Sequence, residues 1–336
     1  MKEKSTTLVR AGIKLIALFL LTASLQVSAA VTAEKTPNDV YQQVELLADD
    51  VRKLRANNNI TADWPSVEFV AGYEPQHVYQ KTLEILGKIN SYRTKVSKTG
   101  GITVPRFPGR DITPNEVYSV VTRLRQEMNL LVQNRGLQES QESQDVVNKS
   151  PSDVYAALAE VSIALEETLG LRSIRPAEVY MRSVQVVELS RFLRKSQNLP
   201  LDVAKPVLTQ GKFPNHALRS VHELLGKIGV AEHNLWMKAF QQPRLPRRVI
   251  TPSDVFDAMG VAIAELHRIQ FRLGLEREFS DLEEQKTRGQ TPDDVIQNTA
   301  WAEALLPLFD LGSPLQQYNR SALNKTPSQV YPRFLS

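Results

Sequence analysis

The stretches ITPNEVY (Ile112–Tyr118) and ITPSDVF (Ile250–Phe256) are nearly the same seven residues, written 138 positions apart. Thr or Ser before Pro is typical of a helix start, because the hydroxyl can accept a hydrogen bond from a free backbone N–H. Pro suits the first helical position, where its missing N–H costs nothing. The acidic residue two positions after Pro favours the positive end of the helix and completes a capping box. The motif therefore predicts a helix start wherever it occurs.

Related motifs recur along the chain at a nearly constant spacing. Successive prolines are 38, 39, 37, 25, 38, 38, 40 and 35 residues apart. The one short interval divides the first eight copies into two sets of four, which match in order at offsets of 139, 139, 138 and 141 residues. The prolines are Pro37, Pro75, Pro114, Pro151, Pro176, Pro214, Pro252, Pro292 and Pro327. We infer an ancient four-unit module that was later duplicated whole.

Each unit carries the apolar pattern of one packed helix. Counted from the proline, apolar residues fall at +3, +7, +10, +14 and +17, which is a heptad stripe. In the first unit these residues are Val40, Val44, Leu47, Val51 and Leu54. The sequence predicts an all-α protein with a repeat of about 38 residues, in a helical-bundle or solenoid-like arrangement. Each repeat would hold one helix of roughly 18–22 residues and a long extended loop.

The connections between the predicted helices are of two kinds. Most are long enough for the chain to run back along a helix, so helices within a module could be parallel or antiparallel. The fourth and fifth helices are joined by LRSIR (Leu171–Arg175) after Gly170, and so short a connection is typical of an antiparallel pair. We predict four segments: a signal peptide at 1–33, four-helix modules at 34–170 and 171–311, and a C-terminal partial repeat at 312–336.

The first 33 residues have the pattern of a Sec-type signal peptide. Four basic residues precede or flank the apolar run LIALFLLTASL (Leu15–Leu25), and VSAA (Val27–Ala30) provides small residues for cleavage. The run is short for a spanning helix, although an uncleaved membrane anchor is the alternative. The chain has no Cys, which excludes lipoprotein anchoring, disulfides and thiolate metal sites. We expect a bacterial periplasmic protein, with the cell surface or secretion as alternatives, and no stable membrane span after cleavage.

The charge balance and the missing motifs exclude several function classes. The chain has 41 Lys and Arg against 37 Asp and Glu, but removing the four basic residues and one acidic residue before Ala30 leaves a net charge of about +1. The basic balance is therefore no argument for a nucleic-acid partner. Phosphate-loop, nucleophile-elbow and HExxH motifs are missing from the sequence. We predict no enzymatic activity, no cofactor and no metal, and an exposed, unremarkable role for the paired His77 and His216.

Two features remain as candidate sites. The paired loops PRFPGR (Pro105–Arg110) and PRLPRR (Pro243–Arg248) have stiff, Pro-rich backbones that would hold guanidinium groups ready for carboxylates or phosphates. Their arginines could bind an anion or a partner, or the loops could simply cover a helix. The candidates are Arg106, Arg110, Arg244, Arg247 and Arg248. Gly87 and Gly226 hold corresponding mid-helix positions, where Gly costs about 1 kcal/mol relative to Ala, and they indicate either close helix packing or space for a ligand.

Two functional hypotheses follow. The first is a non-enzymatic exported helical-repeat protein that docks other envelope macromolecules, either a periplasmic protein or an anionic glycan or lipopolysaccharide. The alternative is a periplasmic helical bundle that binds a small ligand as a sensor or carrier. A polar cavity inside each module would favour the carrier, whereas a filled core beside an accessible patch would favour docking.

Overall fold

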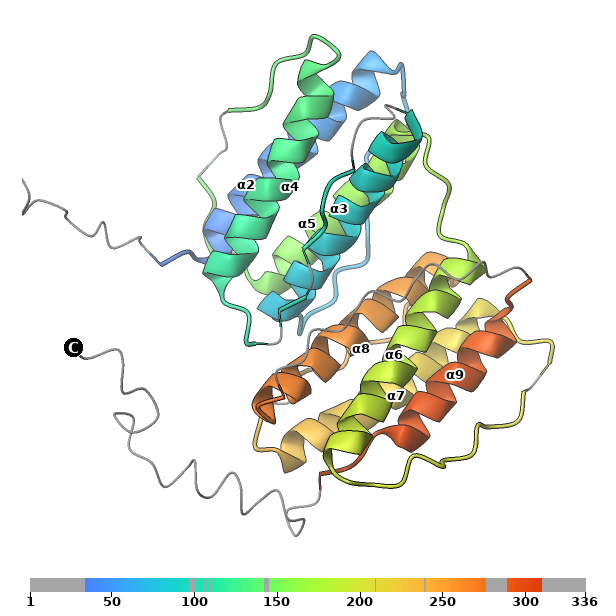
Figure 1. Ribbon diagram of the computed structural model, residues 1–336. Coiled ribbons are helices and arrows are strands. Elements are labelled where there is room, and N and C mark those ends of the chain that lie inside the picture. Colours follow the sequence, from blue (N-terminus) through green and yellow to red (C-terminus); the bar gives the residue numbers. More distant parts are fainter. Residues whose placement is uncertain are drawn as a thin grey trace, which may run out of the picture. The chain divides into compact units, whose positions relative to one another are not determined.

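Every helix that the structure describes begins at one of the repeated prolines. The computed structural model describes residues 34–96, 101–105, 107–108, 110–141, 145–208, 210–238, 240–275 and 289–309, and the regular structure in these ranges is entirely helical (Figure 1). The helices are α2 (Pro37–Asn57), α3 (Pro75–Val96), α4 (Pro114–Gln133), α5 (Pro151–Thr168), α6 (Pro176–Ser196), α7 (Pro214–Asn234), α8 (Pro252–Arg272) and α9 (Pro292–Leu305). The all-α prediction and these helix starts are confirmed. The predicted signal peptide, Arg106 and the partial repeat at 312–336 lie outside the described residues.

The side chain two residues after each proline holds the first turn of its helix. It accepts a hydrogen bond, over 2.7–3.1 Å, from the backbone N–H of the residue before the proline. The acceptors are Asp39, His77, Glu116, Asp153, Glu178, His216, Asp254 and Asp294. The two histidines accept through Nδ1 and therefore do the work that Asp or Glu does elsewhere.

Helices α2 to α5 run parallel, because hydrogen bonds and ion pairs join their like ends. Helix α2 contacts α4 and α5, and α3 contacts the same two helices. The pairs at the N-terminal ends are Lys35–Asn115, Asn38–Lys149 and Tyr73–Ser152. The pairs at the C-terminal ends are Asn58–Thr168 and Arg93–Glu127. Each long loop therefore returns along the bundle before the next helix starts (Figure 1).

Helices α6 to α9 follow the same scheme, with α6 and α7 each contacting α8 and α9. The pairs that join their like ends are Lys212–Asp293, Arg194–Leu305, Asn234–Leu308 and Arg272–Leu235. The expected antiparallel pairing of the fourth and fifth helices is wrong, since α5 and α6 do not pack along one another. The apolar face of α5 is buried in the first bundle and that of α6 in the second, so Leu171–Arg175 leads from one bundle to the other.

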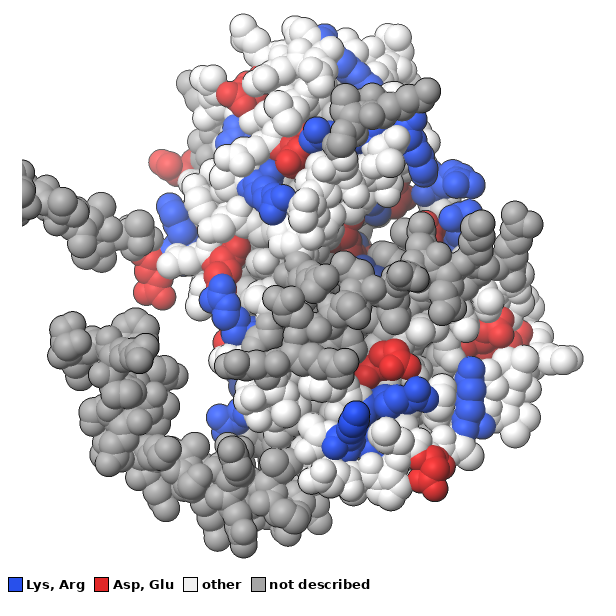
Figure 2. Space-filling view, viewed as in Figure 1, with Lys and Arg blue, Asp and Glu red and all other residues white. Residues whose placement is uncertain are grey.

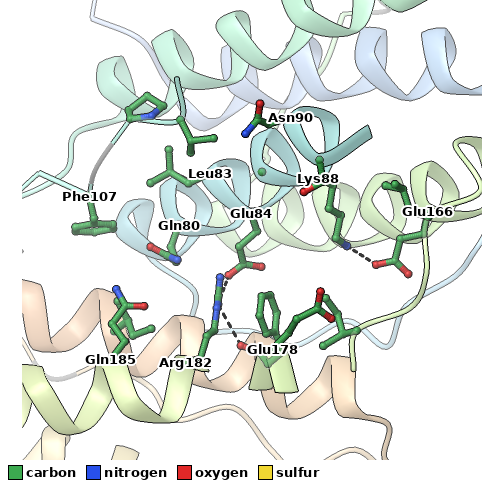
Figure 3. Close-up of a pocket in the computed structure, with 18 of the residues that line it drawn as sticks. Gln80, Leu83, Glu84, Lys88, Asn90, Phe107, Glu166, Glu178, Arg182 and Gln185 are labelled. Carbon is green, nitrogen blue, oxygen red and sulfur yellow. Dashed lines mark hydrogen bonds and ion pairs between the residues drawn. The ribbon is translucent and has the colours of Figure 1, made fainter. Parts of the chain in front are cut away.

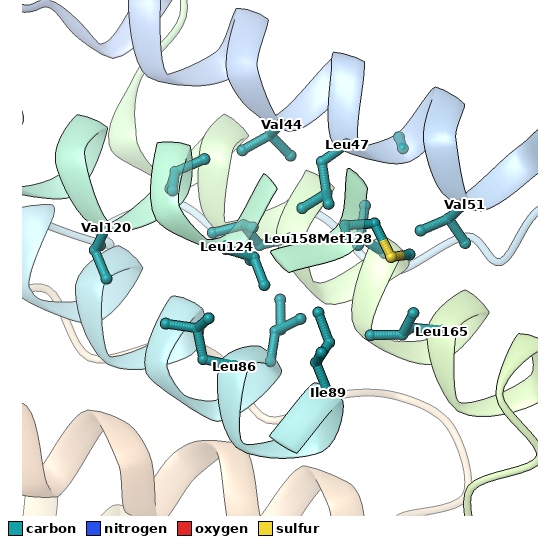
Figure 4. Close-up of a cluster of buried hydrophobic side chains, with 14 of the residues drawn as sticks. Val44, Leu47, Val51, Leu86, Ile89, Val120, Leu124, Met128, Leu158 and Leu165 are labelled. Carbon is teal, nitrogen blue, oxygen red and sulfur yellow. The ribbon is translucent and has the colours of Figure 1, made fainter. Parts of the chain in front are cut away.

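Buried apolar side chains form two clusters, one within α2–α5 and its loops and one within α6–α9 and its loops. The predicted stripe of the first unit, from Val40 to Leu54, is at most 2% exposed. Side chains from all four helices of the first bundle meet in Figure 4, among them Leu47, Leu86, Leu124 and Leu158. Burial of this stripe is what orients each helix toward its bundle axis. No described helix is both long and apolar enough to cross a membrane.

Truncating a stripe residue should cost much of the free energy of unfolding. Leu124 and Leu266 are both 0% exposed, one in each cluster. Leu124→Ala or Leu266→Ala should destabilise the protein by about 2–5 kcal/mol, because burial is lost and the cavity closes incompletely. Urea denaturation followed by circular dichroism measures this. Leu130 on α4 is 46% exposed, so Leu130→Ala is the control. This substitution should change the stability by less than about 1 kcal/mol. An equal loss at Leu130 would contradict the helix phase.

Candidate functional site

The two bundles meet through α3 and α8, and charged side chains form this contact. Lys81 Nζ on α3 lies 2.7 Å from Asp257 Oδ1 on α8 and 3.5 Å from Glu84 Oε2. The Lys81 side chain is 4% exposed. Burial by itself would lower the pKa of Lys81, but Asp257 and Glu84 raise the pKa above its ordinary value. Lys81 is therefore a buried cation that two carboxylates hold in its charged form.

Two buried carboxylates lie at the same contact. His77 Nε2 on α3 is 2.5 Å from Glu265 Oε1 on α8, and Gln76 Nε2 donates to the same oxygen over 2.9 Å. Burial and the neighbouring Glu265 raise the pKa of Glu232. Burial also acts to raise the pKa of Glu265, but His77, Glu232 and Arg268 together hold that pKa below its usual range. Glu232 therefore keeps the proton and Glu265 the charge. The expectation that His77 is exposed is wrong, because its ring reaches Glu265 while capping α3.

A cleft of about 1110 Å³ opens beside this contact, between α3 and the second bundle (Figure 3). Its walls are one face of α3, Glu166 on α5 and residues of α6 and α8, together with residues of two connecting segments. These are Val104, Pro105, Phe107, Pro108 and Arg110 before α4, and Leu171, Arg172, Ile174 and Arg175 after α5. Arg182 Nη1 on α6 lies 2.6 Å from Glu84 Oε1 and links α6 to α3 across the cleft. Gly260 on α8 leaves room for this pair, since a Cβ there would lie 2.6 Å from both Arg182 Nη1 and Glu84 Oε1.

The described residues that line the cleft carry a surplus of positive charge, with six basic and three acidic side chains. Each acidic residue has a basic partner: Glu84 has Arg182 at 2.6 Å, Glu166 has Lys88 at 2.5 Å, and Glu178 has Arg175 at 3.9 Å. Within the described part of the chain, Lys95 and Arg172 form no ion pair with a carboxylate. Basic and acidic side chains are otherwise interspersed on the face that Figure 2 shows.

Aromatic rings form part of the cleft wall. The Phe107 ring stacks on the His267 ring with centroids 5.0 Å apart and an interplanar angle of 14°, and its edge meets Tyr79 at 5.6 Å. Burial lowers the pKa of the His267 imidazole to about 4. At neutral pH this ring is therefore uncharged and adds apolar surface to the wall.

The structure does not bring the predicted loop arginines together. Arg110 lines the cleft, whereas Arg244 and Arg248 border a smaller pocket of about 120 Å³ and Arg247 is exposed. Arg110 pairs with Glu116, and Arg248 binds both oxygens of Asp254 at 2.5 and 2.8 Å. Both carboxylates cap the helix that follows the loop. Arg110 and Arg248 therefore have the same intramolecular role, which uses part of their capacity for binding an external anion.

The two paired glycines differ in their surroundings. A Cβ on Gly87 would meet no described atom within 4 Å, and on Gly226 only Gln242 Oε1 at 3.9 Å. Within the described residues, no close helix contact at the Cβ position calls for glycine at either place. Gly87 lines the cleft together with Arg110, whereas Gly226 is exposed on α7.

Several residues of the contact escaped the sequence analysis. Lys81, Asp257 and Glu265 lie beside the apolar stripes of their helices, where a charged residue is ordinarily solvated. No feature of the neighbouring sequence distinguishes these three residues from charged residues on the solvent-exposed faces of the helices. Gly260 offered a signal, because a glycine in mid-helix is costly, but it has no glycine counterpart in the first half of the chain.

The described residues contain no group of three or more His, Asp or Glu side chains that could hold a metal ion. No protein-family model, curated protein or solved structure matches the chain.

Replacing His267 should change how stability depends on pH. Its folded pKa of about 4 lies below the unfolded value of about 6.5, so the unfolded state takes up the proton first as the pH falls. The stability of the native protein should drop by about 1.4 kcal/mol per pH unit between those values through this group. In His267→Gln this loss should vanish, so the difference in unfolding free energy between native protein and variant should shrink on acidification. Urea titrations at several pH values measure it, with the exposed His233→Gln as control. Parallel pH profiles would contradict the assignment.

Proposed function

We propose that the protein is a non-enzymatic, exported helical-repeat protein that docks another envelope macromolecule in the cleft beside α3. Gly87 is the observation that carries this proposal. It stands in mid-helix at a cost of about 1 kcal/mol, and neither contact with a described atom nor backbone conformation calls for glycine there. A bare helix backbone at the edge of a large cleft has a clear use if a partner approaches it closely.

The alternative function, a small-ligand carrier, would place its pocket inside a bundle. The clusters inside the two bundles are apolar, and the large cleft lies between α3 and the second bundle. The stretch of α3 that lines the cleft, from Gln80 to Lys95, covers about four helical turns. This location and this length favour the docking of a macromolecule.

We further propose that the chain consists of a signal peptide at 1–33, two duplicated modules at 34–170 and 171–311, and a partial repeat at 312–336. Three matching features support the duplication. His77 and His216 cap corresponding helices, Arg110–Glu116 and Arg248–Asp254 correspond, and the helices of each half contact one another in the same scheme. The pattern of the first 33 residues supports export to the periplasm.

Export has a direct test. N-terminal sequencing of the protein recovered from the periplasmic fraction should begin between Ala30 and Glu34. An intact Met1 terminus in the membrane fraction would instead indicate an uncleaved anchor.

Filling the cleft at Gly87 should abolish docking without unfolding the protein. Gly87→Leu places a side chain where a Cβ meets no described atom, and a better helix former should raise the stability by up to about 1 kcal/mol. Immobilised native protein and variant would be compared for capture from envelope extract, quantified by mass spectrometry. We expect the captured partner to be lost from Gly87→Leu only.

Gly226→Leu is the matched control, because it makes the same substitution at the corresponding, exposed position of α7. It should gain similar stability and retain the partner. Equal capture by both variants would refute the cleft as the docking site.

A further inference from the structure

We propose that the occupant of the cleft is an extended acidic segment of a partner protein, whose carboxylates bind Lys95 and Arg172. This inference rests on the proposed function and names the chemistry of its partner. Its support is the distribution of charge, length and apolar surface along the cleft.

The two cations lie at the same end of the cleft. Lys88 Nζ on α3 is 2.5 Å from Glu166 Oε1 on α5, and the two helices run parallel. Lys95 lies on α3 two helical turns beyond Lys88, in the last turn of that helix. Arg172 lies four residues after the last residue of α5, so both residues are near the C-terminal ends of these parallel helices. Both residues are exposed, and both line the cleft. Carboxylates of an incoming segment could therefore bind these two side chains without displacing an ion pair within the described part of the chain.

The carboxylates of the cleft do not oppose such a ligand. Glu84 is 4% exposed and lies against Arg182 and Lys81. Glu166 is 17% exposed and is held by Lys88, which also hydrogen-bonds Ser162. Glu178 is 45% exposed and has Arg175 at 3.9 Å as its partner. Each of these carboxylates is therefore offset by a cation, and the basic residues of the described lining without a carboxylate partner are Lys95 and Arg172.

Length and surface chemistry favour a polypeptide over a phosphate or a sulfated glycan. The stretch from Gln80 to Lys95 is about 22 Å long at 1.5 Å per residue, and an extended chain would cover it with about seven residues. Gln80 on α3 and Gln185 on α6 present amide donors and acceptors from opposite walls, as a peptide backbone requires (Figure 3). Leu83 and Phe107 add apolar surface that the apolar side chains of a peptide can cover.

Fluorescence anisotropy with a labelled seven-residue peptide of alternating Glu and Leu tests the inference on the mature protein. We expect saturable binding at low salt that weakens as salt screens the charges. The counterpart peptide with Gln in place of Glu should bind about tenfold more weakly, because charge-assisted hydrogen bonds are lost. The double variant Lys95→Glu/Arg172→Glu should lose a similar factor or more, and Gly87→Leu should not bind.

The matched control is Lys195→Glu/Lys205→Glu, which reverses the same amount of charge at exposed residues outside the cleft. Lys195 lies in the last turn of α6, as Lys95 does in α3, so the control also accounts for the helix dipole. It should bind the acidic peptide like the native protein.

Three outcomes would overturn the inference: no saturable binding of the acidic peptide, equal affinity for the Gln peptide, or an equal loss in the control variant. Tighter binding of a sulfated oligosaccharide than of the peptide would also overturn it and would assign the cleft to an anionic glycan. Loss of capture from envelope extract in Gly87→Leu alone would still stand in each case, so failure of this inference differs from failure of the proposed function.

Discussion

The parallel direction of the helices within each bundle is the constraint on which the rest of the structure depends. Each helix carries a partial positive charge at its N-terminus and a partial negative charge at its C-terminus, so a parallel bundle gathers like charges at both ends. The acceptor side chain two residues after every proline offsets the positive ends, as Asp39 and Glu116 show. Basic residues in the last turns, such as Arg55 and Lys95, offset the negative ends. Lys95 of the cleft therefore lies where the parallel arrangement favours positive charge.

The sequence predicts those parts of the fold that local chemistry determines. A capping motif such as Thr113–Glu116 acts within one turn, and the stripe from Val40 to Leu54 acts within one helix, so helix starts and buried faces could be read directly. Helix direction could not, because the stripe is the same for parallel and antiparallel packing. The short Leu171–Arg175 connection was misleading, since the apolar faces on either side of it belong to different cores.

The candidate site was predicted only where a residue breaks a local rule. Gly87 is costly in mid-helix and Arg110 stands in a stiff loop, so the sequence predicts both as candidate site residues. Both line the cleft. Lys81 and Glu265 break no rule within their own helices, because their partners come from the other bundle. A buried ion pair adds little net stability, but removing one partner leaves an uncompensated charge. The contact between α3 and α8 therefore specifies which surfaces meet more than it stabilises them.

The return loops also have a consequence for how the chain reaches its native state. Helix α2 packs on α4 and α5 rather than on its sequence neighbour α3, and the same skipping occurs in the second bundle. Contacts between helices therefore join residues farther apart in the sequence than they would in an up-and-down bundle, where sequence neighbours pack on one another. Folding rates fall as contact order rises, because the entropy of closing long loops is lost before the contacts that repay it can form. By this topology each bundle should fold more slowly than an up-and-down bundle of the same length.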